Sequence, residues 1–223
     1  MCNLYSMRSN KEAIRDITHF LRATAEMDNL APYPAIFANG WGPIVRNTPN
    51  GRELARVRWG MPSPVFALKG KNYDGGVTNV RNAASSHWRR WLGVENRCVV
   101  PATSFCEPDQ ASGSKANTWF ALDDSRPLFF FAGVWTPQWT SVRKVKDGET
   151  TDDLYAFLTT DANAEVAGVH PRAMPVILRT PDEIEAWLTL PTVEALKRQA
   201  PLPDGSLSVV AIGPKSDDAS ILI

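Results

Sequence analysis

The sequence has few cysteines, and their spacing matches neither a disulfide framework nor a zinc site. Only three occur in 223 residues, no Cys-x-x-Cys pair is present, and the three histidines do not pair with them at metal-binding spacings. Small secreted scaffolds and structural zinc modules depend on such patterns. We therefore expect reduced thiols, no metal and no cofactor, in a protein of the cytoplasm.

A long apolar run is also missing. Met1-Cys2-Asn3 leads directly into polar sequence, without the apolar core of a secretory signal. The most apolar segment, 127–135, is far too short to cross a bilayer. The sequence therefore predicts a cytoplasmic location and no membrane partner.

An excess of charge of either sign is absent, because Lys+Arg and Asp+Glu both number 24. A protein that coats nucleic acid through bulk positive charge is therefore not expected. A local basic groove is still compatible with this balance, and so are ordinary solvated faces. Both interpretations stay open for three clusters: Arg52, Arg56 and Arg58; Arg81, Arg89, Arg90 and Arg97; and Arg143, Lys144 and Lys146.

The remaining composition is that of a globular protein. With 43% hydrophobic and 22% charged residues, the chain is long enough to bury a sizeable core. We expect one domain over residues 1–223 and a monomer. The eight tryptophans are a high number, and they serve either the core or stacking surfaces.

Local signals predict where the first elements lie. Ser9-x-x-Glu12 has the pattern of a capping box and predicts a helix that ends near Asp28. Asn50-Gly51 predicts a hairpin between strands at 43–47 and 52–59. Arg56 and Arg58 alternate with apolar residues in the second strand, which predicts one basic face.

Further short strands and a few helices are expected along the rest of the chain. The segment 141–153 is polar and charged, and we interpret it as a loop. Many short strands with interspersed helices indicate an α+β fold, built on a curved, mainly antiparallel, barrel-like sheet flanked by helices. The expected strands are 97–102, 117–122, 128–135, 155–160, 174–178 and 207–212, and the expected helices are 82–92, 182–190 and 192–199.

Cys2 has a reactivity that no internal cysteine shares. Once Met1 is removed, residue 2 carries both a free α-amine and a thiol. The amine, with a pKa near 8, condenses with an aldehyde to an imine, and the thiol then closes a five-membered thiazolidine ring. The alternative is that Cys2 is an incidental second residue, and position alone favours that alternative.

Three further residues are candidates for chemistry, each with a structural alternative. His170, just before a predicted strand, could move a proton near neutral pH or could simply pack. Glu107 closes an apolar run, so it is either buried with a raised pKa or exposed in a loop. Asn79, in a loop that enters a helix, either orients a carbonyl or amine or shapes a turn.

Taken together and in order, these residues and their neighbours resemble the SOS response-associated peptidase family. The resemblance runs from Met1 to about Leu188, and no single motif decides it. It rests on Met1-Cys2, Arg58-Trp59-Gly60-Met61-Pro62, Asn79-Val80-Arg81, Arg97 to Ala102 with Phe105 and Glu107, Phe131 to Trp135, Thr159 to Asn163, His170 with Met174 to Leu178, and Glu185 to Leu188.

The resemblance implies a specific activity and fold. Members shield abasic sites in single-stranded DNA through a thiazolidine cross-link at the N-terminal cysteine, on one α+β domain with a barrel-like sheet. It assigns the nucleophile to Cys2, orientation to Asn79, and acid–base roles to Glu107 and His170. It also implies removal of the residue ahead of the cysteine by the protein itself, which explains the family's name, and a lyase-like activity.

Three residues near these motifs are candidates for DNA contacts. Arg81 follows Asn79 closely and is expected to bind a flanking phosphate, and Arg58 is a second candidate. Trp59 either stacks on a neighbouring base or packs beneath the site, and the sequence leaves both open.

The sequence departs from the family pattern at two places. Relatives commonly carry Tyr before the glutamate and Trp after it, where this chain has Cys106 and Pro108. Relatives often have His-x-Arg-Met-Pro, whereas Ala173 here adds one residue before Met174. Neither change removes a candidate group, but both alter its surroundings.

Two other functions fit parts of the sequence. Cys2 with His170 could serve a cysteine peptidase that acts on other proteins, although no oxyanion hole or substrate groove is evident. The Arg and Trp residues could form a non-covalent module for single-stranded DNA, which zero net charge disfavours. Dependence on the abasic aldehyde separates both from covalent capture.

Overall fold

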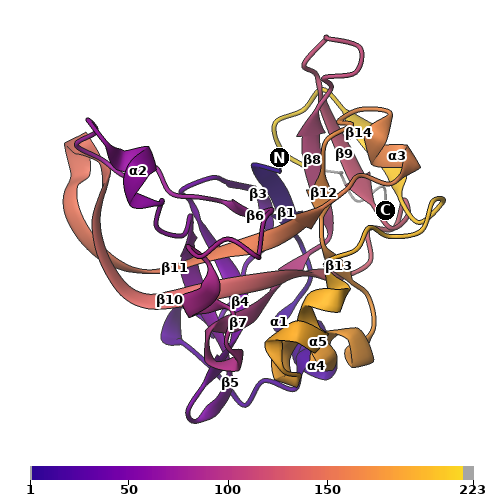
Figure 1. Cartoon of the computed structure of the whole chain (residues 1–223). Helices are drawn as coiled ribbons and strands as arrows, with labels where there is room; N and C mark the ends of the chain where they lie inside the picture. Colours follow the sequence, from indigo (N-terminus) through magenta and orange to yellow (C-terminus); the bar gives the residue numbers. More distant parts are fainter. Residues whose placement is uncertain (1, 218–223) are drawn as a thin grey trace.

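The computed structural model describes residues 2–217 and contains two sheets with short helices around them (Figure 1). The strands are β1 (Leu4–Met7), β2 (Arg22–Ala23), β3 (Tyr33–Phe37), β4 (Trp41–Thr48), β5 (Gly51–Trp59), β6 (Asn79–Val80), β7 (Arg97–Ala102), β8 (Ser104–Pro108), β9 (Asn117–Ala121), β10 (Phe129–Lys144), β11 (Gly148–Thr160), β12 (Met174–Pro175), β13 (Ile177–Leu178) and β14 (Ser208–Ile212). The helices are α1 (Lys11–Thr18), α2 (Val65–Leu68), α3 (Ala164–Ala167), α4 (Pro181–Thr189) and α5 (Thr192–Ala195).

Five strands close into a barrel. In the order β11, β10, β7, β4 and β5, each strand pairs antiparallel with the next. The barrel closes because β5 pairs in parallel with β11, with Arg58 opposite Leu154 and Trp59 opposite Tyr155. The expected α+β fold with a mainly antiparallel, barrel-like sheet is confirmed.

A second sheet places the start of the chain beside a strand from its middle. Its order is β14, β9, β8, β1 and β3, with antiparallel pairing throughout. Leu4 of β1 lies opposite Cys106 of β8. This register brings Cys2, two residues before Leu4, close to Glu107, the residue after Cys106.

An aromatic core joins the two sheets. Tyr5 of β1 reaches the barrel, where its hydroxyl lies 2.5 Å from the hydroxyl of Tyr155. Trp59 is stacked on Phe157 with ring centroids 5.1 Å apart, and it meets the edge of Tyr5 at 5.2 Å. Gly42 is required here, because a Cβ at this position would lie 2.6 and 2.7 Å from the two tyrosine hydroxyls.

The segment 141–153, expected to be a loop, is instead part of a long hairpin. β10 and β11 continue their pairing to Lys144 and Gly148, around a turn at Val145–Asp147. The hairpin arm extends from the barrel toward α2 (Figure 1). The arm carries polar residues on both faces, including the buried Arg143, so it lacks the apolar alternation by which a strand is recognised.

The first helix is shorter than the sequence predicts. The cap is Asn10 rather than Ser9, since its side chain accepts from the Ala13 N–H at 2.8 Å. The helix ends at Thr18, His19 takes a left-handed conformation with φ of 52°, and the chain then pairs with β5 as β2. The backbone groups of Arg22 and Ala23 pair with β5 and not with a further helical turn.

Residues 82–92, expected to be a helix, form turns and a short 3₁₀ segment at Arg89–Trp91. The rings of Trp88 and Trp91 are buried and meet the ring of His87 edge-on. This ring packing, together with turn hydrogen bonds such as Trp91 N–H to the Trp88 carbonyl at 2.9 Å, holds the segment.

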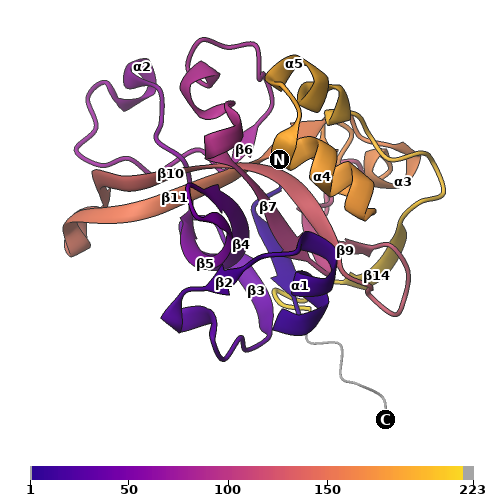
Figure 2. The same ribbon diagram turned by 90° about the horizontal axis from the view of Figure 1, so that it is seen from below.

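The C-terminal helices agree better with expectation. α4 begins with a capping box in which Thr180 and Glu183 bond reciprocally. It packs on β7 and β10 and touches α1, as the view from below shows (Figure 2). α5 is followed by a 3₁₀ turn at Leu196–Arg198, which divides the helix expected at 192–199. No helix within residues 2–217 is long and apolar enough to cross a membrane.

Candidate active site

Cys2 lies two residues before β1, with its thiol buried. Its side chain is inaccessible to solvent, and Sγ lies 3.4 Å from the Leu4 carbonyl and 3.9 Å from the Cys106 carbonyl. Burial raises the pKa of the Cys2 thiol well above its ordinary value, and the nearby Glu107 charge raises it further. The thiol is therefore protonated at rest and needs a base in order to react.

Asn79 anchors the main chain at Cys2. It lies in β6, opposite Phe157 of β11, and not in a loop that enters a helix. Its Nδ2 donates to the Cys2 carbonyl at 2.8 Å and to Thr78 Oγ1 at 2.7 Å. Its Oδ1 is buried without a hydrogen-bond partner within residues 2–217. An acceptor is therefore left beside the residue that would carry the amine.

Thr78 extends this anchor, although the sequence did not single it out. Its hydroxyl donates to Asn3 Oδ1 at 3.0 Å, and its carbonyl accepts from Trp59 Nε1 at 3.0 Å. Only its position next to Asn79 could have indicated it. Thr78 links the aromatic core to Asn3, the residue after Cys2.

Glu107 is a buried carboxyl on the strand beside Cys2. Its side chain is fully buried, so of the two positions that the sequence left open, burial and an exposed loop, the structure has the buried one. Burial raises the pKa of Glu107 to about 7. At neutral pH this carboxyl can therefore both donate and accept a proton.

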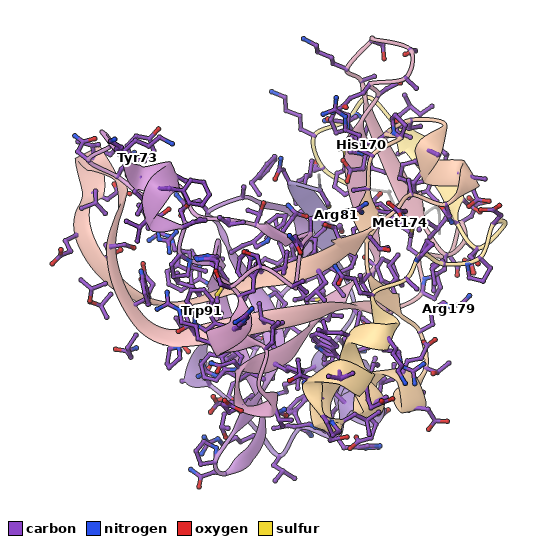
Figure 3. The ribbon with its side chains drawn as sticks, viewed as in Figure 1. Tyr73, Arg81, Trp91, His170, Met174 and Arg179 are labelled. Carbon is purple, nitrogen blue, oxygen red and sulfur yellow. The ribbon has the colours of Figure 1, made fainter. Side chains whose placement is uncertain are left out.

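His170 lies in the turn between α3 and β12. The main-chain carbonyl of Val169 accepts from Gln110 N at 2.9 Å and Ala111 N at 3.1 Å, which ties this turn to the loop after β8. In Figure 3, the labelled His170 and Met174 follow the segment that runs from α3 to β12. The imidazole is 2% exposed.

The extra residue Ala173 determines the tautomer of His170. The His170 Nδ1 lies 3.2 Å from the Ala173 carbonyl oxygen. Because a carbonyl only accepts, Nδ1 must carry the proton, and Nε2 of the neutral ring is then a base. Burial lowers the pKa of His170, which favours the neutral ring.

The three DNA-contact candidates differ in how accessible they are. Arg81 is partly exposed, with 41% of its side chain accessible, and it forms an ion pair with Asp161. Arg58 is buried and donates to Asp152 Oδ2 at 2.6 Å. The expected basic face of β5 is therefore reduced to Arg56, and Arg58 is not presented to a phosphate.

Trp59 takes the packing alternative. Its ring is completely buried, stacked on Phe157 and bonded through Nε1 to Thr78. No face of the ring is open to a base in this structure. Through its bond to the Thr78 carbonyl, Trp59 supports the segment that carries Asn79.

A cavity of about 710 Å³ lies at the other end of the β4–β5 hairpin. Thr48, Arg52, Trp135 and Leu188 are among the residues that line it. None of the four catalytic candidates contributes to it. The candidate site is therefore defined by the contacts around Cys2 and not by this cavity.

Comparison with known families assigns the chain. The model of the SOS response associated peptidase family, SRAP, matches residues 1–215. The chain belongs to the SRAP family. Membership gives the protein a DNA-damage-related role, and the family's name refers to a peptidase-type activity.

Solved structures have the same fold as this SRAP chain. A protein from Bordetella bronchiseptica has 23% identity and a TM-score of 0.69, with 93% of this chain and 97% of that chain covered. A protein from Bacteroides thetaiotaomicron also has 23% identity and a TM-score of 0.69, covering 93% and 90%. A phage-related protein from Bordetella bronchiseptica has 21% identity and a TM-score of 0.63, covering 93% and 92%. No curated protein matches the chain.

Proposed function

We propose that this protein shields abasic sites in single-stranded DNA by a covalent thiazolidine cross-link through Cys2, after Met1 has been removed. The observation that carries the proposal is the arrangement around Cys2. Asn79 holds its carbonyl at 2.8 Å, and Glu107, with a pKa of about 7, lies on the neighbouring strand. A 1,2-aminothiol beside a neutral-range acid–base group is suited to an aldehyde.

The reaction proceeds in two bond-forming steps. The α-amine of Cys2 adds to the C1′ aldehyde of the opened deoxyribose, and loss of water gives an imine. The thiol then adds to the imine carbon, its proton passes to the nitrogen, and the five-membered ring closes. No oxidant or second substrate is consumed.

Each neighbouring group has a task in these steps. Glu107 protonates the departing hydroxyl as water leaves and accepts the thiol proton before ring closure, because its pKa lies near neutrality. His170 Nε2 removes the proton of the C1′ hydroxyl as the C1′–O4′ bond breaks, and the resulting imidazolium returns a proton to O4′, which becomes the C4′ hydroxyl. Asn79 orients the sugar or amine through Oδ1 while Nδ2 holds the main chain.

Arg81 is the residue we assign to the flanking phosphate. Its guanidinium is partly exposed and already faces a carboxylate, Asp161, whose place a phosphate can take. Arg58 and Trp59 do not contact DNA in this proposal. Arg58 forms an internal ion pair with Asp152, and Trp59 packs in the aromatic core. We further propose that the protein acts as a monomer and that it removes Met1 itself.

A cysteine peptidase acting on other proteins is less compatible with this site. Such enzymes stabilise the thiolate with a neighbouring cation, which lowers the thiol pKa. Here burial and the carboxylate of Glu107 raise the pKa of Cys2. Proton transfer to Glu107 suits a slow single event better than repeated turnover.

The test is intact mass spectrometry before and after mixing with a single-stranded oligonucleotide that carries one abasic site. We expect a protein lacking Met1 and an adduct that survives denaturation. Borohydride-reduced abasic DNA, which has no aldehyde, and intact DNA are the matched controls. Adduct on either control, or undiminished adduct with Cys2→Ala, would refute the proposal.

Cys2→Ser separates the two bond-forming steps. Serine keeps the α-amine but replaces the thiol, so we expect an imine that borohydride traps and that is otherwise lost on denaturation.

A panel of unrelated peptides tests the hypothesis that the protein is a cysteine peptidase. Cleavage of that panel without any DNA adduct would favour a general peptidase instead.

A further inference from the structure

The β10–β11 arm is fastened to the segment that delivers Asn79. Residues 61–77 form a loop that leaves the barrel after Gly60 and returns just before Thr78, with Met61 and Val77 bridged at its neck. The Asp74 N–H donates to the Val142 carbonyl of the arm at 2.8 Å. The loop and the arm are therefore bonded to each other close to the neck.

Asp74 organises the neck from within. Its carboxylate accepts from Ser63 N at 3.0 Å and from Gly76 N at 2.8 Å, so it joins the outgoing and returning halves of the loop. The side chain is 8% exposed. Two main-chain donors on one buried carboxylate fix the separation of the two halves.

Arg143 of the arm closes the neck from outside. It is 2% exposed, and its Nη1 lies 3.4 Å from the Asp74 carbonyl and 4.0 Å from Asp74 Oδ2. A Cβ on Gly76 would lie 2.5 Å from this nitrogen and 2.9 Å from the Gly60 Cα. The guanidinium therefore packs against Gly76, where no side chain would fit.

The contacts continue without a gap to the candidate nucleophile. Val77 is followed by Thr78, which bonds to Asn3 and Trp59, and then by Asn79, whose Nδ2 holds the Cys2 carbonyl at 2.8 Å. We infer that Asp74 and Arg143 are positioning residues that set the placement of Asn79 against Cys2. This inference rests on the proposed function for its consequence in catalysis.

The buried charge of Arg143 is balanced mainly by Asp74. Asp74 acts most strongly on the guanidinium, Asp152 adds a weaker attraction and Arg58 a repulsion, while Nε and Nη2 have no hydrogen-bond partner within residues 2–217. Removing the Asp74 charge alone would therefore leave a buried cation without its main counter-charge. The test therefore needs a second variant in which both charges are removed.

The experiment measures cross-linking at saturating abasic single-stranded DNA. We expect Asp74→Asn, and the neutral pair Asp74→Asn with Arg143→Met, to slow adduct formation by about tenfold or more, with half-saturation changed less than about twofold. Thr140→Val with Thr151→Val, which removes a bond across the exposed part of the arm, is the matched control. It should keep the rate of the unaltered protein.

A double-mutant comparison separates positioning from general loss of structure. If the neck acts through Asn79, then adding Asp74→Asn to Asn79→Ala should slow the reaction no further. An equal loss in both backgrounds, or an unchanged rate in the neutral pair, would overturn the inference. Folding of every variant is followed by thermal unfolding.

A DNA-independent readout keeps the two proposals distinguishable. Alkylation of Cys2 by iodoacetamide, mapped by peptide mass spectrometry, should rise about tenfold in the neutral pair and in Asn79→Ala, because both loosen the buried thiol. If the unaltered protein forms no adduct, the proposed function fails, but faster alkylation of the neutral pair would still support the inference that Asp74 and Arg143 position Asn79. Unchanged alkylation in the neutral pair would overturn that inference.

Discussion

The side-chain amide of Asn79 donates to the main-chain carbonyl of Cys2 at 2.8 Å. The bond grips the backbone of residue 2 and not its thiol. It therefore restrains the residue without engaging Sγ or the α-nitrogen, the two atoms that the proposed reaction uses. The two strands involved come from opposite parts of the fold, since β6 pairs with the barrel and β1 with the second sheet.

Glu107 should make stability depend on pH. Its folded pKa is about 7 against an ordinary 4.5, so its contribution is complete below pH 4.5 and is lost as pH rises through 7. The loss amounts to about 3 kcal/mol, from about 1.4 kcal/mol per pKa unit. Glu107→Gln should therefore be more stable than the unaltered protein at pH 8 and similar at pH 5, by urea unfolding.

An exposed carboxylate on the arm provides the control for Glu107. Glu149→Gln removes one negative charge far from any buried site and should leave the free energy of unfolding unchanged at both pH values. A stability difference for Glu107→Gln that is the same at pH 5 and pH 8 would contradict the burial argument.

His170 should matter for opening the sugar and not for the later steps. We expect His170→Asn to slow cross-linking to abasic DNA by about 10²-fold, the usual contribution of a general base. An oligonucleotide with an acyclic aldehyde at the same position needs no ring opening and should react at the unaltered rate. Equal slowing on both substrates would assign His170 another role.

The lowered pKa of His170 has a consequence for the pH profile. The proposed mechanism uses the neutral ring as the base, and burial lowers the pKa of His170, so the ring stays neutral to lower pH than an ordinary imidazole. The acid limb due to His170 should therefore lie below pH 6.5, the ordinary value. This limb should vanish in His170→Asn, as rate measurements across pH will test.

Arg81 should control reversible affinity for DNA. Arg81→Gln should weaken binding of intact single-stranded DNA and reduce the salt slope by about 0.7, the value for one phosphate contact. Asp161→Asn should strengthen binding, because it removes the carboxylate that competes for Arg81. Fluorescence anisotropy at several salt concentrations measures both, and unchanged slopes would remove Arg81 from the interface.

Arg58 is the contrasting arginine. Its ion pair with Asp152 is buried, so Arg58→Gln should cost about 3 kcal/mol in the free energy of unfolding by stranding that carboxylate. The salt slope for DNA should stay the same. A reduced slope without loss of stability would restore Arg58 as a phosphate contact.

Trp59 should behave as a core residue. Trp59→Leu keeps an apolar side chain but leaves a cavity and removes the bond to Thr78, so we expect a loss of about 3 kcal/mol in stability. Affinity of the folded variant for intact single-stranded DNA should not change. A loss of affinity of 1 kcal/mol or more, about the worth of one stacked base, would favour the stacking role instead.

Much of the local structure could be predicted because its signals are local. Asn50-Gly51 marks the β4–β5 hairpin, Thr180 and Glu183 cap α4, and the apolar run at 97–102 is β7. The predictions that were wrong concern segments whose partners lie elsewhere in the chain. α1 ends early because the following residues pair with β5, and the polar arm is a strand pair without an apolar face.

The sequence by itself determined which reactive groups this protein carries and to which family it belongs. It has a cysteine at position 2, few other thiols, balanced charge and the ordered motifs of the SRAP family. Those are properties of residue type and order, which are readable along one dimension. Only the tertiary structure decided that Trp59 packs in the core and that Arg58 forms an ion pair with Asp152. It also decided that Asn79 bonds to Cys2 and Thr78 to Asn3. Such contacts depend on strand register across long separations, and burial, which sets the pKa of Glu107, follows from them.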